Sequence, residues 1–96
     1  MVVVIDGRNI TKVEDIHNLL KRKLSLPDYY GMNLDALWDV LSSYINFPLI
    51  VIWKNFDLSP ALISESNKKI ANLFQLAENE INDFNCIILN SNQTLF

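Results

Sequence analysis

The stretch LIVIW at residues 49–53 is an uninterrupted apolar run of strand length, and Pro48 separates it from the residues before it. Two similar runs lie towards the ends of the chain, one at Val2–Ile5, followed by an Asp-Gly turn, and one at Cys86–Leu89. Short apolar runs rich in β-branched residues and bounded by turn residues are typical of buried strands. The sequence therefore predicts three strands.

Two helices are expected between the first and second strands. Thr11 and Glu14 have the spacing of a capping box, and apolar residues then recur at helical spacing until Pro27. Asn33 is a suitable N-cap for the second helix. The predicted inward residues of the two helices are Val13, Ile16, Leu19, Leu20 and Leu24, and then Leu34, Leu37, Leu41 and Trp38.

The second connection also predicts two helices. Ser59 and Pro60 read as the N-cap and first residue of a short helix, and Ser64 or Ser66 begins a longer one. The inward residues predicted for the longer helix are Ile70, Leu73, Phe74, Ala77 and Ile81. Strands joined by helical crossovers indicate a parallel sheet with right-handed connections. We expect a small α/β domain with a three-stranded parallel sheet and about four helices, followed by a short tail at Asn90–Phe96.

The charges are unevenly spread. The 96 residues carry a net charge of −3, yet no Lys or Arg lies between Lys23 and Lys54, where three aspartates fall. The rest of the chain has eight basic and eight acidic side chains, so this segment holds the whole net charge. An acidic surface without lysines repels nucleic acid and attracts a cationic partner. We therefore expect no nucleic-acid binding, and no apolar run approaches the roughly 18 residues of a membrane span.

Catalytic and cofactor motifs are missing from the sequence. Two glycines cannot build a P-loop or a GxGxxG turn, and there is no CxxC or paired histidine for zinc. The single histidine, His17, lies within a predicted helix, where a hydrogen-bonded or solvated side chain is the expected role. The single cysteine, Cys86, is expected to be a buried thiol in a cytoplasmic protein, since Met1–Ile5 is too short for a signal peptide. We expect neither an enzyme nor a cofactor.

Carboxylates and aromatic residues gather in the lysine-free segment. Asp35 and Asp39 are four residues apart, so they share one face of the second helix. The aromatic residues of the same segment are Tyr29, Tyr30, Trp38 and Tyr44. A solvated acidic face explains most patterns of carboxylates alone. Exposed aromatic rings mixed with anions favour a protein-binding surface.

The block PDYYGMNLDALWD at residues 27–39 resembles the signature of the barstar family of intracellular ribonuclease inhibitors. The resemblance covers residues 1–89, with Asp6-Gly7, Pro48 and Trp53 also in register. It implies a barstar-like domain with a three-stranded parallel sheet and four helices. It also implies that the loop and second helix enter a ribonuclease active site, where carboxylates take the place of substrate phosphates.

The resemblance assigns roles to individual residues. Tyr29 would stack on the enzyme's catalytic region, Asp39 would pair with its phosphate-binding arginines, and Asp35 would meet another basic group. Glu80 would pair with a lysine at the rim. The residues implied to support this interface are Asn33, Trp38, Ser42 and Tyr44. Leu76 departs from the family, in which an acid can stand beside Glu80.

The leading hypothesis is a cytoplasmic inhibitor, monomeric when free, of a secreted or toxin-type ribonuclease with a basic active site. Two alternatives remain open at this point. One is a barstar-like interaction module whose partner is not a ribonuclease. The other is a divalent-metal or hydrolase site formed by Asp35, Asp39 and Glu80, for which the sequence offers no supporting motif.

Overall fold

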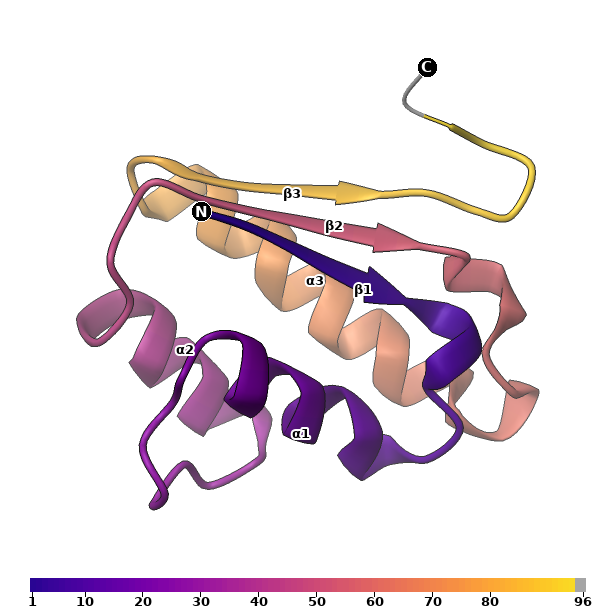
Figure 1. Ribbon diagram of the computed structural model, residues 1–96, viewed down its shortest axis with the longest axis horizontal. Coiled ribbons are helices and arrows are strands. Elements are labelled where there is room, and N and C mark those ends of the chain that lie inside the picture. The colour runs from indigo at the N-terminus through magenta and orange to yellow at the C-terminus, as the bar shows by residue number, and fades with distance from the viewer. Residues whose placement is uncertain (95–96) are drawn as a thin grey trace.

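The computed structural model describes residues 1–94 and contains one parallel sheet in that part of the chain (Figure 1). Its strands are β1 (Val2–Asp6), β2 (Leu49–Lys54) and β3 (Phe84–Ile88), in the order β1-β2-β3. The central strand pairs with both neighbours, and Val51 lies opposite both Val3 and Cys86. The predicted sheet and α/β class are confirmed. Within the predicted tail, Leu95 and Phe96 lie outside the described residues.

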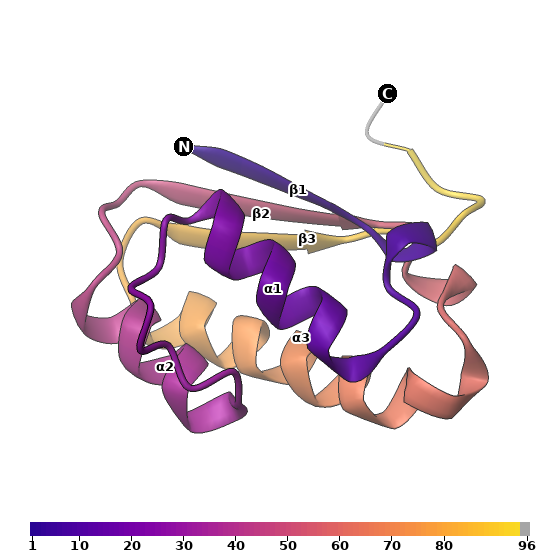
Figure 2. The same cartoon turned by 60° about the horizontal axis from the view of Figure 1, so that its bottom comes forward.

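Three α-helices cover one face of the sheet, α1 (Val13–Lys23), α2 (Leu34–Ser43) and α3 (Ser64–Glu80), as Figure 2 shows. The connections also contain the 3-10 turns η1 (Gly7–Asn9), η2 (Phe56–Leu58) and η3 (Ala61–Ile63). The short third helix predicted from Ser59 and Pro60 is therefore only a 3-10 turn. The Ser59 hydroxyl does not cap it but donates a hydrogen bond to the Gly7 carbonyl at 3.1 Å.

Because the helices lie on one face, the strands are buried on alternate residues. Val3, Ile5, Val51 and Trp53 face the helices and are at most 3% exposed, whereas Val2 on the open face is 58% exposed. The prediction of a buried strand at Val2–Ile5 therefore holds for Val3 and Ile5 but not for Val2 and Val4. A continuous apolar run does not reveal whether one or both faces of a sheet are covered.

The helix starts are set by local hydrogen bonds. The α1 N-cap is Lys12, so the reciprocal acid is Asp15 and not Glu14 as predicted. The Asp15 carboxylate accepts from the Thr11 and Lys12 backbone N–H groups at 2.9 and 3.0 Å, which lowers its pKa. Asn33 caps α2 as predicted, by accepting from the Ala36 N–H at 2.8 Å. Leu34, predicted to point inward, is 36% exposed in the first turn of α2.

The carboxyl ends of β1 and β2 are tied together by η1 and η2. Asp6 accepts from the Arg8 guanidinium at 2.7 Å and from the Asn55 amide at 3.0 Å, and these bonds hold its pKa well below the usual range. A Cβ added to Gly7 would overlap the Asn55 carbonyl. The backbones of the two turns are thus in direct contact, which only glycine permits at position 7.

Gly7→Ala is expected to lower the free energy of unfolding by about 1–3 kcal/mol or more, because backbone atoms must move to admit the methyl group. Urea unfolding measures the change. Gly31→Ala is the control, since its Cβ would meet only side-chain atoms, Cβ of Ala36 at 3.3 Å and Nδ2 of Asn33 at 3.6 Å. Equal, small losses in both variants would contradict the close contact at Gly7.

Asn67 in α3 is 2% exposed, and neither its Nδ2 nor its Oδ1 has a hydrogen-bond partner among residues 1–94. A buried polar group left unpaired costs stability, so Asn67→Leu, which has the same shape, is expected to stabilise the protein by about 1 kcal/mol. Asn72→Leu, at an exposed position of the same helix, corrects for helix propensity. Chemical denaturation measures the free energy of unfolding of both variants. If Asn67→Leu stabilises the protein no more than Asn72→Leu does, the Asn67 amide is hydrogen-bonded in solution.

Candidate partner-binding surface

The loop before α2 is anchored by Tyr30. This side chain is buried, and its hydroxyl lies 2.7 Å from Nδ1 of the buried His17 of α1. The Tyr30 N–H also donates to the Pro27 carbonyl at 2.9 Å, and burial raises the pKa of the Tyr30 hydroxyl to about 12. His17 is therefore a hydrogen-bonded core residue, one of the two roles expected for it. The anchored Tyr30 constrains the backbone at the neighbouring Tyr29, whose side chain is 85% exposed.

Helix α2 presents the two aspartates to solvent. Leu37, Val40 and Leu41 are buried, so Asp35 and Asp39 face away from the core. Neither carboxylate forms a hydrogen bond or ion pair within the described part of the chain. The structure thus leaves both anions free to meet an external cation.

The other predicted contact residues on α2 already have structural roles. Trp38 is half-buried against the core, and the Ser42 hydroxyl donates to its carbonyl at 2.8 Å. Tyr44 is 46% exposed, but its hydroxyl donates to the Ser25 carbonyl at 3.1 Å and ties the end of α2 to the end of α1. Asn33 uses its amide oxygen for the helix cap. These four residues therefore help to hold the shape of the surface.

Glu80 is exposed at the last residue of α3, the helix that packs against α2. One turn earlier on α3, Leu76 is 49% exposed. An exposed apolar side chain therefore stands near the end of α3, beside the carboxylate that the sequence suggested for the rim.

Two cations that the sequence pattern missed approach the acidic segment. The Lys21 ammonium donates to the Asp28 carbonyl at 3.4 Å. Lys69 of α3 lines a hollow of about 200 Å³ together with Asn33 and Leu34. A count of charges along the chain could not find them, because both lysines come from helices that pack beside the segment.

The structure gives no support to the metal or hydrolase alternative. Within residues 1–94, no group of three or more His, Cys, Asp or Glu is placed to hold a metal ion. Cys86 is half-buried, and burial together with the nearby Glu78 carboxylate raises its pKa to about 12, so the thiol is a poor nucleophile. In the same part of the chain, no helix combines the length and apolarity needed to cross a membrane.

Comparison with known proteins relates the chain both to a protein family and to an individual protein. A sequence profile of the family described as Barstar (barnase inhibitor) matches residues 1–89. The chain is also 41% identical over 81 residues to the putative ribonuclease inhibitor YrdF of Bacillus subtilis strain 168, an alignment that covers 84% of this chain and 89% of that protein. Both matches include the loop and α2.

Burial lowers the pKa of His17, so the unfolded chain binds its proton more readily than the folded protein. Its contribution to stability should be complete above about pH 6.5, fall as the pH drops below that value, and level off below the folded pKa. His17→Gln keeps a hydrogen-bonding side chain but does not titrate. We expect urea midpoints to fall less in the variant than in the wild type between about pH 7 and pH 5. Parallel profiles would contradict the buried neutral histidine.

Proposed function

The chain belongs to the barstar family, a family of inhibitors and not of enzymes, and we propose that it inhibits a secreted or toxin-type, barnase-like ribonuclease. The inhibitory surface consists of Tyr29, Asp35 and Asp39. It covers the basic active site of the enzyme, and Glu80 contacts the rim. The observation that carries the proposal is that two exposed carboxylates of α2 have no partner among residues 1–94, in a segment that also exposes 85% of Tyr29.

The mechanism follows from the chemistry of the target. A ribonuclease must present cations to bind the phosphates of RNA, and those cations can also pair with a protein carboxylate. Asp35 and Asp39 form no internal ion pair within the described chain, so no intramolecular ion pair is broken when they bind. Inhibition is stoichiometric and requires no chemical step.

Preorganisation supports tight binding. Tyr30 is held by His17, and Asn33 fixes the first turn of α2, so Tyr29 and Asp35 are positioned before the partner arrives. Less conformational entropy is then lost on association. The opposed charges of the two proteins would also accelerate their encounter, most strongly at low ionic strength.

The exposed Leu76 bears on the choice of partner. An apolar side chain at this position contributes no charge to the rim and favours a partner whose facing surface is apolar. A ribonuclease whose rim carries further lysines, beyond the one that Glu80 contacts, would bind this inhibitor less tightly than an inhibitor with an acid at position 76.

Asp39→Ala is expected to weaken inhibition of a basic microbial ribonuclease at least about tenfold, because the cations of the active site lose their anionic partner. Stability should barely change, since the Asp39 carboxylate has no partner in the described chain. Titration of ribonuclease activity with each variant provides the measurement.

Glu65→Ala is the matched control, because it removes the same charge from an exposed position in the first turn of α3. It should leave inhibition within about twofold of the wild type. If both variants lose inhibition to the same extent relative to the wild type, net charge and not the α2 surface accounts for binding. If the wild type inhibits none of a panel of basic ribonucleases, a different partner must be sought.

A further inference from the structure

Two anchored parts of the proposed inhibitory surface meet just before α2. On one side, Tyr30 is fastened to α1, and its neighbour Tyr29 is exposed. On the other side, Asn33 caps α2, which carries Asp35 in its first turn. The two residues between Tyr30 and Asn33 make no backbone hydrogen bond within residues 1–94. The relative position of Tyr29 and Asp35 therefore depends on what else holds this junction.

Met32 has an unfavourable backbone conformation at the junction. Its φ is 53°, in the left-handed region, which a residue with a side chain adopts at a cost in energy. Such a conformation persists only where the surrounding structure fixes it. The preceding Gly31 is exposed and has no side chain that could do so. Because neither residue has a backbone hydrogen bond, the Met32 side chain is left as the source of this stabilisation.

The Met32 side chain has apolar surroundings. It is half-buried and packs against the hydrophobic core. It also borders a hollow of about 200 Å³, whose walls include Val13 of α1 and Ile70 of α3. The unbranched thioether side chain of methionine adapts well to an irregular site of this kind. Met32 thus attaches the junction to the two helices beside it.

We propose that Met32 is a positioning residue of the inhibitory surface, an inference that rests on the function proposed above. Its side chain, held between α1 and α3, joins the loop that carries Tyr29 to the turn of α2 that carries Asp35. In this role Met32 needs no contact with the ribonuclease. Without its side chain the backbone can rotate at Gly31, and binding must then order the junction at a cost in entropy.

Three substitutions separate the side chain from the backbone strain. Met32→Leu keeps an apolar side chain of similar size, Met32→Ala removes most of it, and Met32→Gly also relieves the left-handed strain. We expect Met32→Leu to inhibit a basic microbial ribonuclease within about twofold of the wild type, and the other two to inhibit it about tenfold more weakly. Met32→Gly should be no less stable than Met32→Ala. Inhibition would then follow the side chain and not the free energy of unfolding.

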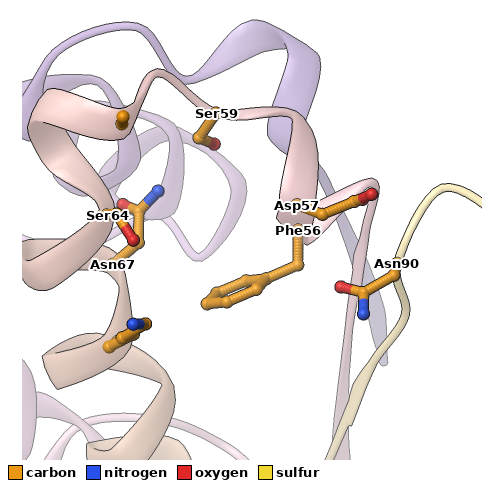
Figure 3. Close-up of a pocket in the computed structure, with 8 residues that line it drawn as sticks. Phe56, Asp57, Ser59, Ser64, Asn67 and Asn90 are labelled. Carbon is orange, nitrogen blue, oxygen red and sulfur yellow. The ribbon is translucent and has the colours of Figure 1, made fainter.

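Two substitutions elsewhere control for a general loss of packing. Val13→Ala removes apolar contacts from another wall of the same hollow, outside the loop. Phe56→Leu removes an edge-to-face contact with Trp53, with ring centroids 4.8 Å apart, beside a separate cavity beyond β2 (Figure 3). Figure 1 shows η2, which contains Phe56, at the opposite end of the molecule from α2. Phe56→Leu should lower the free energy of unfolding, yet both controls should inhibit within about twofold of the wild type.

Hydrogen exchange in the free protein tests the same role without a ribonuclease. The N–H groups of Ala36 and Leu37 donate to Asn33, so their exchange reports on the first turn of α2. We expect exchange about tenfold faster than in the wild type for Met32→Ala and unchanged exchange for Met32→Leu.

The proposal is overturned if Met32→Ala leaves inhibition or exchange unchanged, if Met32→Leu behaves like Met32→Ala, or if Val13→Ala weakens inhibition as much as Met32→Ala. If the wild type inhibits no ribonuclease, the proposed function fails, and exchange alone decides whether Met32 holds the start of α2.

Discussion

Parallel pairing of β1 with β2 is the constraint on which the rest of the structure depends. Two parallel strands cannot be joined by a tight turn, so the chain must cross from the end of β1 at Asp6 back to the start of β2 at Leu49. That crossover contains α1, the loop of residues 24–33 and α2. Apart from Glu80 at the rim, the candidate binding surface is therefore built within the connection between β1 and β2.

A second requirement is that this long connection should hold one shape. The buried contact between Tyr30 and His17 fastens the loop to α1, and the Tyr44 hydroxyl fastens the end of α2 to Ser25. The polar side chains between these two attachment points can remain exposed without loss of order. A rigid segment with unpaired carboxylates suits recognition of a cationic protein surface, where little rearrangement is required on binding.

The sequence predicts those features that depend on neighbouring residues. The three strands, α1, α2 and the Asn33 cap follow from local apolar patterns and turn residues. Features that depend on contacts distant in sequence were missed. Ser59, for example, donates to the distant Gly7 carbonyl instead of capping a helix. One local feature was also missed, because α1 is capped one residue later than expected and Asp15 takes the place of Glu14. Lys21, Lys69 and the unsatisfied Asn67 become noticeable only once the helices are packed.

Because the helices cover only one face of the sheet, the other face is exposed on the side of the molecule away from them. Asn85 in β3 is exposed and lies opposite Ile50, so it belongs to the face that the helices leave open. A cysteine or a chemical tether at this position would attach the protein to a sensor surface or resin with α2 directed outwards. An affinity matrix oriented in this way would present every molecule in the same productive orientation.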